Sequence, residues 1–257
     1  MRIETSYACH PGKRRANNQD NLYYQGKVLQ KDHRRAGKAF PSKWDTGELL
    51  CFGVFDGMGG EQYGELASYL AADITKEILS SQTDERIPSD LLYEICKKAN
   101  EVILKKTVEL KAERIGTTIA MVMLRYDTIW CCNIGDSKIF RLRGEEFKQL
   151  SMDHVAAYAE DPERKPGLTA HLGMGPTEIF PNPYMINETI MPEDIYLICS
   201  DGITDMVSLA DIQMMIRGNR IGKSVRSLLR RALDQGGHDN ATMVLIKVIE
   251  EGGKRRK

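Results

Sequence analysis

The chain has 257 residues, of which 42% are hydrophobic and 28% are charged, with 36 Lys and Arg against 36 Asp and Glu. This composition predicts a soluble globular protein with a sizeable core, in one large domain or two small ones. The zero formal net charge does not favour binding to nucleic acid or to a membrane surface. Without an apolar stretch of membrane-spanning length or a signal-peptide core, we expect a cytoplasmic protein with no membrane span.

The six cysteines form no C-x-x-C pair, and four of them lie in or beside apolar, strand-like runs. We therefore expect buried, reduced thiols rather than disulfides or zinc ligands. The end of the chain is basic, and residues 250–257 are expected to form a solvated tail.

The first half of the chain predicts strands followed by a pair of helices. Apolar runs are typical of strands at residues 2–9, 21–25 and 49–56, and the charged stretch 27–48 between them predicts a surface excursion. Two amphipathic helices with apolar stripes at helical spacing are expected next. They begin near Glu61 and at Pro88.

The second half predicts closely spaced strands, an irregular stretch and a second helix pair. Strands are expected at 117–126, 128–134, 137–143, 146–150, 185–190, 194–200 and 241–249, and helices near 208–217 and 222–234. The short turns between the first four strands predict an antiparallel meander. The irregular stretch 161–183 holds five of the nine prolines. The element order predicts an α+β fold in one domain over residues 2–249, a sheet sandwich with a helix pair on each outer face.

Four aspartates lie within two positions of a glycine, at the ends of apolar runs or just before one. They are Asp56 in CFGVFDGMGG, Asp136 in CCNIGDSKIF, Asp201 in YLICSDGITD and Asp239 in QGGHDNATMV. A single Asp-Gly pair is more often a plain turn, but four in similar settings predict carboxylates that meet at one edge of a sheet. Like charges crowd together only when cations neutralise them, so a site for several metal ions is the leading hypothesis.

Carboxylate oxygens suit hard divalent ions such as Mg²⁺ and Mn²⁺. Gly57 and Gly202, which lack a Cβ, allow the backbone to pass close to such an ion, and the Gly57 carbonyl could itself be a ligand. Two ions about 3.5–4 Å apart can activate a shared water toward a phosphoryl group. Upstream, Asp20 adds a carboxylate and Arg15 a guanidinium that suits phosphate, although a surface Arg in a basic run is the simpler interpretation of Arg15 alone.

Seven motifs together resemble the protein phosphatase 2C family, the metal-dependent serine/threonine phosphatases, and its bacterial branch in particular. In chain order they are RRANNQDN, VFDGMGG, GTTIAMVML, NIGDSKIFRL, LSMDHV, LICSDGITD and GGHDNATMVLI. The resemblance covers roughly residues 2–249. It implies an αββα four-layer sandwich of two antiparallel sheets flanked by helix pairs, and metal-dependent hydrolysis of phosphoserine and phosphothreonine in proteins.

The resemblance also implies roles for individual residues. Asp56 would bridge two Mg²⁺ or Mn²⁺ ions, and Asp201 and Asp239 would complete the first site. The Gly57 carbonyl and waters held by Asp20 would serve the second. Asp136, with Asp201, would hold a third ion. Arg15 would bind the substrate phosphate.

The chain departs from the family pattern at two positions. Gln19 replaces a Glu that many relatives carry, and Met58 stands where animal relatives place a His thought to be the general acid. The identity of the general acid is therefore left open. The interval after His154 is shorter than the usual flap of the family, so substrate choice transfers least well from the resemblance.

Two other functions compete with a protein phosphatase that acts as a monomer on phosphorylated proteins. One is a catalytically weak, phosphatase-like binding module, which loss of metal carboxylates would favour. The other is a phosphatase for a small phosphorylated metabolite. We expect residues 155–183 to choose the substrate, because their prolines keep them out of a sheet ladder while both ends are tied near the proposed metals. Residues 27–48 are the alternative.

Overall fold

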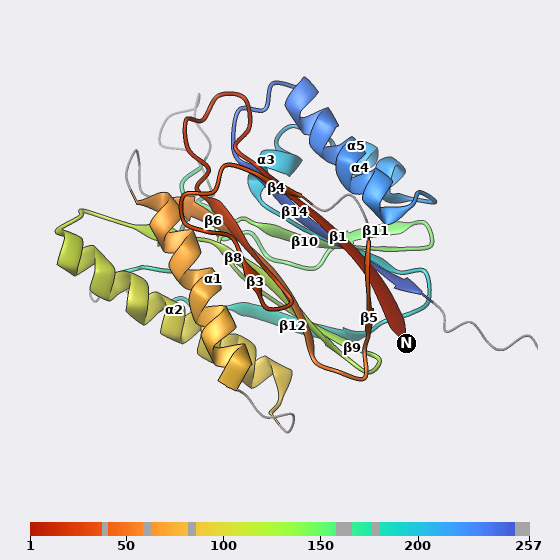
Figure 1. The fold of residues 1–257 in the computed structure, drawn as a ribbon, viewed down its shortest axis with the longest axis horizontal. Helices are drawn as coiled ribbons and strands as arrows, with labels where there is room; N and C mark the ends of the chain where they lie inside the picture. The colour runs from red at the N-terminus through yellow and green to blue at the C-terminus, as the bar shows by residue number, and fades with distance from the viewer. Residues whose placement is uncertain (38–40, 59–62, 82–85, 158–165, 176–179, 250–257) are drawn as a thin grey trace, which may run out of the picture.

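The structure is a computed structural model, shown in Figure 1. It describes residues 1–37, 41–58, 63–81, 86–157, 166–175 and 180–249. The expected helix start at Glu61 and the expected basic tail over 250–257 lie outside these residues. No helix in the described part of the chain is long and apolar enough to span a membrane.

Two antiparallel sheets form the centre of the fold. The first has the order β11-β10-β13-β14-β1-β4, with β5 also pairing with β1. Its strands are β1 (Arg2–His10), β4 (Ala36–Gly37), β5 (Ser42–Asp45), β10 (Lys138–Arg143), β11 (Glu146–Gln149), β13 (Ile195–Cys199) and β14 (Ala241–Ile249). The second has the order β12-β9-β8-β6-β2-β3, with β7 also pairing with β6. Its strands are β2 (Asp20–Tyr24), β3 (Lys27–Val28), β6 (Leu50–Met58), β7 (Gly116–Thr117), β8 (Ile119–Arg125), β9 (Thr128–Ile134) and β12 (Tyr184–Thr189).

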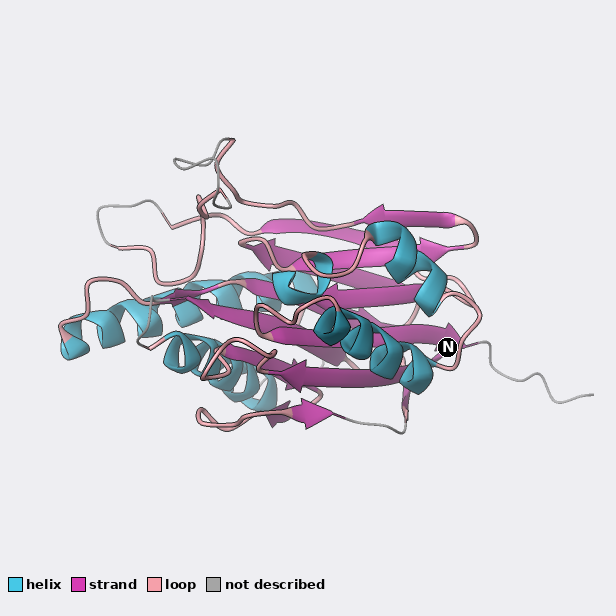
Figure 2. Cartoon of the chain, turned by 90° about the horizontal axis from the view of Figure 1, so that it is seen from above, coloured by secondary structure: helices cyan, strands magenta, loops and turns pink. Residues whose placement is uncertain are grey.

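Helices cover the outer face of each sheet. The long helices α1 (Gly64–Ser81) and α2 (Pro88–Leu110) pack on the second sheet, and α3 (Asp201–Thr204), α4 (Leu209–Ile216) and α5 (Ile221–Asp234) pack on the first. Figure 2 looks onto the short helices, which lie over the strands of the first sheet. The layers therefore follow the order helices, sheet, sheet, helices, and the expected four-layer α+β sandwich is confirmed.

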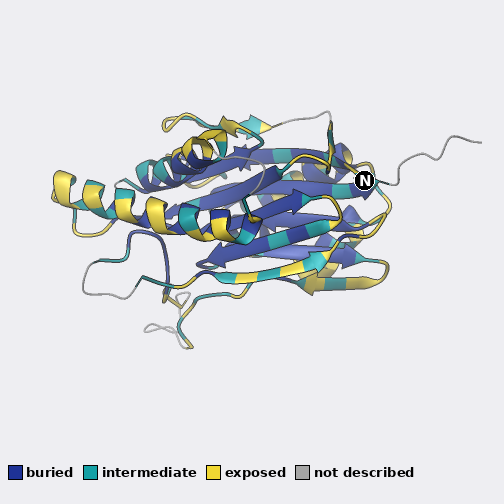
Figure 3. Ribbon diagram, turned by 90° about the horizontal axis from the view of Figure 1, so that it is seen from below, coloured by how far each residue is buried: buried dark blue, intermediate teal, exposed yellow. Residues whose placement is uncertain are grey.

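Strand β8 packs against a different core on each of its two faces. Met121 and Met123 face the core beneath α1 and α2, whereas Val122 and Leu124 face the core between the two sheets. Successive side chains of a strand point to opposite faces, so a strand covered on both faces is apolar throughout. Figure 3 shows the central strands as buried and the outward faces of the helices as exposed.

The expected meander is wrong at one step. Strands β8 and β9 pair in one sheet, and β10 and β11 pair in the other, so the chain changes sheet between β9 and β10. Gly135, with a φ of +100°, stands at this crossing, in a backbone region that favours glycine. The stretch 27–48 also differs from a plain excursion, because it contributes the short edge strands β3, β4 and β5.

Two of the expected Asp-Gly turns are absent. Strand β6 continues through Asp56 and Gly57 to Met58, because Gly57 still pairs with Thr117 of β7. Asp201 begins the one-turn helix α3 directly after β13. Both aspartates therefore belong to regular elements rather than to turns.

Candidate metal centre

The five aspartates come from both sheets and lie where strands begin, end or change sheet. Asp20 opens β2 and pairs in register with Asp56 near the end of β6. Asp136 lies at the crossing from β9 to β10, Asp201 follows β13, and Asp239 precedes β14. The sandwich thus gathers at one end the carboxylates that the sequence spreads over most of its length.

Electrostatics shows that the five carboxylates share one environment. Burial raises the pKa of Asp56 well above its ordinary value, and Asp20, Asp201, Asp136 and Asp239 each raise it further. Burial is also the largest cause that raises the pKa of Asp20, to about 7, with further increases from Asp201 and Asp239. Mutual repulsion of this kind is expected where a cation belongs among the carboxylates.

Hydrogen bonds from Thr117 of β7 and from Thr118, which lies between β7 and β8, hold the backbone of Asp56. Thr117 Oγ1 and the Thr118 amide both donate to the Asp56 carbonyl, each at 2.9 Å. The Asp56 amide donates to Thr118 Oγ1 at 3.1 Å, and that oxygen lies 2.7 Å from Ser137 Oγ. Ser137 follows Asp136, so one buried hydroxyl pair joins the loop of Asp136 to the strand of Asp56.

Asp20 has one carboxylate oxygen bonded and one left over. Its Oδ2 accepts a hydrogen bond from Ser200 Oγ at 2.8 Å, and Ser200 Oγ accepts one from the Thr242 amide at 3.0 Å. Its Oδ1 is buried and accepts no hydrogen bond from the described residues. A buried carboxylate oxygen without a donor costs free energy unless a water or a cation contacts it. This oxygen therefore fits a ligand role, direct or through a bound water.

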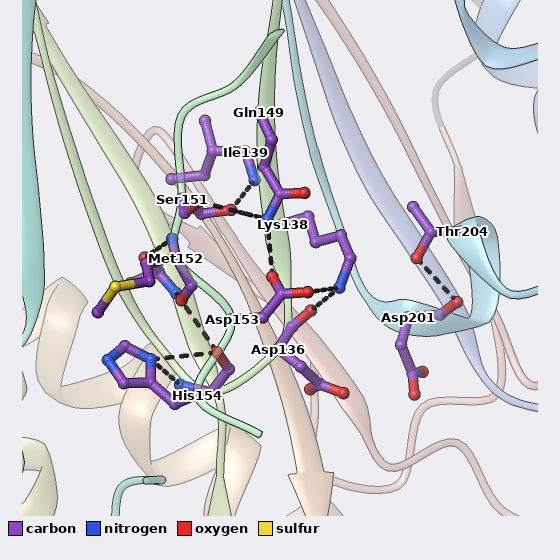
Figure 4. Close-up of polar contacts among 12 residues, drawn as sticks. Asp136, Lys138, Ile139, Gln149, Ser151, Met152, Asp153, His154, Asp201 and Thr204 are labelled. Carbon is purple, nitrogen blue, oxygen red and sulfur yellow. Dashed lines mark hydrogen bonds and ion pairs between the residues drawn. The ribbon is translucent and has the colours of Figure 1, made fainter. Parts of the chain in front are cut away.

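A lysine braces the loop that carries Asp136. Lys138 Nζ donates to the Asp136 carbonyl at 2.9 Å and to Asp153 Oδ2 at 2.7 Å, while Gln149 Nε2 donates to Asp153 Oδ1 at 2.7 Å. Figure 4 shows these contacts on one side of Asp136, with the carboxylates of Asp136 and Asp201 directed to the same side, away from them. The lysine thus stabilises the loop that carries Asp136.

Arg15 lies at the rim of the same group, where it pairs with Asp239. Its Nη2 donates to Asp239 Oδ2 at 2.6 Å, and both side chains are partly exposed, at 53% and 37%. This hydrogen bond is the largest cause that raises the pKa of Arg15, and Asp56 and Asp201 add to it. The guanidinium therefore lies near the cluster of five carboxylates, on its solvent side.

The glycines next to two of the aspartates are required by close backbone approaches. A Cβ on Gly57 would lie 2.1 Å from the Gly64 carbonyl oxygen, and one on Gly202 would lie 1.9 Å from the Asn240 carbonyl oxygen. Real Cβ atoms do not approach an oxygen so closely. Gly57 thus lets β6 meet the start of α1, and Gly202 lets α3 meet the strand that follows Asp239.

The oxygen donors of this site suit hard divalent ions, although the carboxylates do not surround a single point. Among the residues that the structure describes, no group of three or more His, Cys, Asp or Glu side chains is already arranged to hold a metal ion. Coulomb repulsion keeps uncompensated carboxylates apart, and Arg15 already compensates Asp239. An all-oxygen set with the buried, donor-free Oδ1 of Asp20 fits Mg²⁺ or Mn²⁺ better than softer metals.

Sequence analysis missed the residues that position these aspartates. The four residues are all buried: Thr118, which bonds the backbone of Asp56, and Ser137, Ser200 and Asn240, which each lie next to an aspartate in the sequence. Asn240 is fully used: its Oδ1 accepts from the Gln19 amide at 2.8 Å, and its Nδ2 donates to the carbonyls of Pro11 and Asn17 at 3.0 Å each. These four residues lie inside the sequence motifs described above, and that position was the signal from which their role could have been predicted.

The chain is similar in sequence to known proteins of one family. The family described as "Protein phosphatase 2C" matches residues 30–241. The chain is 28% identical over 214 residues to the serine/threonine phosphatase stp of Listeria innocua, covering 76% of this chain and 82% of that protein. It is 27% identical over 265 residues to the protein phosphatase PhpP of Streptococcus pneumoniae, covering 97% and 99%.

The fold is also similar to solved structures of serine/threonine phosphatases. The crystal structure of the catalytic domain of the serine/threonine protein phosphatase PstP, in complex with two manganese ions, has a TM-score of 0.74 and 26% identity, covering 96% of this chain and 100% of that one. The Mycobacterium tuberculosis PstP/Ppp structure has a TM-score of 0.77 at 24% identity, which supports the fold. With a family match over most of its length, the chain belongs to the protein phosphatase 2C family.

Proposed function

We propose that this protein removes phosphate from phosphoserine and phosphothreonine in proteins, with two or three Mg²⁺ or Mn²⁺ ions held by its aspartates. The observation that carries the proposal is the convergence of four other carboxylates on Asp56, each of which raises its pKa. When bound, such ions lower the pKa of a water and neutralise charge on the phosphoryl group. Family membership and the two manganese ions of the PstP structure support the same chemistry.

The proposed ligand roles are those that the family pattern implies, and the position of each residue supports them. Asp56 lies among the other four carboxylates and would bridge two ions, with Asp201 and Asp239 as its partners at the first. Asp20, with its donor-free Oδ1, and the carbonyl of Gly57 would serve the second. The third ion would have two ligands from the chain: Asp136 and Asp201 would hold it.

Arg15 would bind the phosphate oxygens of the substrate. Its guanidinium is half-exposed, it lies on the solvent side of the carboxylates, and it can form two parallel hydrogen bonds to a phosphate. The same guanidinium now bonds Asp239, so phosphate and Asp239 would share or exchange it. A positive group at this place offsets the repulsion between the carboxylates and an incoming dianion.

A substrate panel tests this proposal. Turnover of a phosphothreonine peptide, an aryl phosphate and a set of sugar phosphates would be compared in Mn²⁺ and in excess EDTA. The proposal predicts Mn²⁺-dependent turnover with a kcat/KM for the peptide at least tenfold above that for any sugar phosphate. Higher kcat/KM for a sugar phosphate would indicate a metabolite phosphatase, and phosphopeptide binding without turnover would indicate a binding module.

The proposal also covers the domain organisation, oligomeric state and location of the enzyme. We propose that residues 2–249 act as one catalytic domain, a monomer in the cytoplasm that serves in signalling. All six cysteines are free and buried, which fits a reducing compartment. Size-exclusion chromatography with light scattering would test the monomer.

A further inference from the structure

Two stems border the carboxylate group, residues 154–157 and 166–174. Each stem is tied to one of the aspartate strands. The His154 amide donates to the Gly135 carbonyl at 3.0 Å, next to Asp136. On the other stem, Leu172 forms a β-bridge with Thr117, the residue that donates to the Asp56 carbonyl.

The two stems also pair with each other. The Ala156 amide donates to the Gly167 carbonyl at 2.9 Å, and Val155 forms a β-bridge with Leu168. None of the described residues in 155–183 belongs to a strand of either sheet, but the ends of this region form isolated β-bridges at positions without proline. The stems form a fixed border on the side of the site that Asp136 and Asp56 share.

A buried histidine fastens the second stem. His171 is 1% exposed, and its Nε2 lies 3.0 Å from Arg114 Nε and 2.6 Å from Arg114 Nη2. A guanidinium can only donate, so Nε2 must be the acceptor and the ring proton must be on Nδ1. That N–H then donates to the Leu172 carbonyl at 2.9 Å. One tautomer thus joins Arg114, His171 and the bridged Leu172.

A second contact fastens the same stem to helix α2. The Gly173 amide donates to Asn100 Oδ1 at 2.7 Å, and Asn100 is 6% exposed. Gly173 has a φ of +93°, and a Cβ there would lie 2.4 Å from the Ile115 carbonyl oxygen. A Cβ on Gly116 would lie 2.4 Å from His171 Nδ1. The stem is therefore held tightly, between α2 and the segment that leads into β7.

We propose that the contacts of Arg114 and Asn100 with residues 171–173 form a latch that positions the second stem for contact with a phosphoprotein substrate. The inference rests on the proposed function, because it assigns the border of that site to substrate positioning. A phosphorylated residue bound at the carboxylates would bring its neighbouring residues toward this border, whereas a small aryl phosphate has no neighbouring residues to bring there. Arg114 and His171 are positioning residues in this proposal, since they act through the second stem.

Kinetics on two substrates test the latch. Arg114→Met removes both hydrogen-bond donors to His171 but keeps an unbranched apolar side chain. This variant should raise KM for a phosphothreonine peptide at least fivefold. Its kcat for an aryl phosphate and its Kd for Mn²⁺ should stay within twofold of wild type. Arg114→Lys, which still offers a donor to Nε2, should restore KM for the peptide to within twofold. Asn100→Ala should act in the same direction as Arg114→Met.

Arg86→Met is the matched control. Arg86 pairs with Glu94 near the start of α2, so this variant also removes an arginine contact of that helix but leaves the stem untouched. It should not alter KM for the peptide. If Arg114→Met lowers Tm without changing KM for the peptide, the latch is only structural. Parallel losses on both substrates would mean that it supports the carboxylates, which also overturns the proposal.

Hydrogen exchange separates this inference from the proposed function. The latch predicts that Arg114→Met speeds exchange of the Leu172 and Gly173 amides at least tenfold, while the Thr118 amide bonded to Asp56 keeps its rate. Amide exchange does not depend on catalysis. It therefore tests the latch even if the wild-type protein turned over no phosphopeptide. Unchanged exchange at Leu172 would overturn the latch.

Discussion

Replacing Arg15 by Ala should tighten the binding of Mn²⁺ while it weakens the binding of phosphate. In the structure Arg15 Nη2 lies 2.6 Å from Asp239 Oδ2, and the Asn240 amide donates to Asp239 Oδ1 at 2.8 Å. Both carboxylate oxygens therefore already have a partner. A metal ion that takes Asp239 as a ligand must displace the arginine or share an oxygen with it, and it also meets the positive charge of the guanidinium.

The size of the effect follows from the exposure of the pair. Arg15 and Asp239 are 53% and 37% exposed, so solvent screens the ion pair strongly. Exposed ion pairs contribute about 0.2–1 kcal/mol, which corresponds to a change of up to about fivefold in Kd. We expect Arg15→Ala to lower the Kd for Mn²⁺ by up to about fivefold. The loss of a charge-assisted contact should raise the inhibition constant of inorganic phosphate by about tenfold or more.

Titration calorimetry with Mn²⁺, in the presence and absence of inorganic phosphate, measures both effects. Arg14→Ala is the matched control, because it removes the same charge from the neighbouring exposed position without touching Asp239. Arg15→Lys keeps the charge and should bind Mn²⁺ close to wild type. If Arg15→Ala binds Mn²⁺ more weakly than wild type, or no differently from Arg14→Ala, the proposed competition for Asp239 is refuted.

Three further predictions follow from single contacts. Asp194 is 1% exposed and accepts two hydrogen bonds from Arg143, so Asp194→Asn should lower the free energy of unfolding in urea by about 3 kcal/mol and leave KM unchanged. Gly202→Ala would place a Cβ 1.9 Å from the Asn240 carbonyl oxygen, and kcat should fall at least about tenfold; an unchanged kcat would show that the backbone yields freely. Burial first, and then nearby carboxylates, raise the pKa of Asp20 from 3.8 to about 7, so the metal-free folded protein holds a proton that the unfolded chain releases. Its Tm should therefore fall as pH rises from about 4 to 7, and Asp20→Asn should flatten that dependence; equal slopes in both proteins would contradict the raised pKa.

The elements of the fold could be predicted because each carries a local signal. Strands such as β8 are apolar at every position, and α2 has an apolar stripe that begins at Pro88. The assignment of strands to sheets has no such signal. Nothing local distinguishes the step from β9 to β10, which changes sheet, from the step from β8 to β9, which does not.

The candidate site divides in the same way. Asp56 and Asp201 could be found because each follows an apolar run and precedes a glycine. The pairing of Arg15 with Asp239 joins residues 224 positions apart, and that of Arg114 with His171 joins residues 57 apart. Such contacts depend on how the layers pack, so the pattern around either residue does not predict its partner.

Phosphate release from a phosphothreonine peptide, measured for wild type and Asp56→Asn across a Mn²⁺ titration, tests the central claim most directly. We predict that EDTA abolishes release by wild type, that Mn²⁺ restores it, and that folded Asp56→Asn is at least about 10²-fold slower at saturating Mn²⁺, because Asp56 lies among all four other carboxylates. Full turnover in excess EDTA, or an Asp56→Asn enzyme as fast as wild type, would contradict the account.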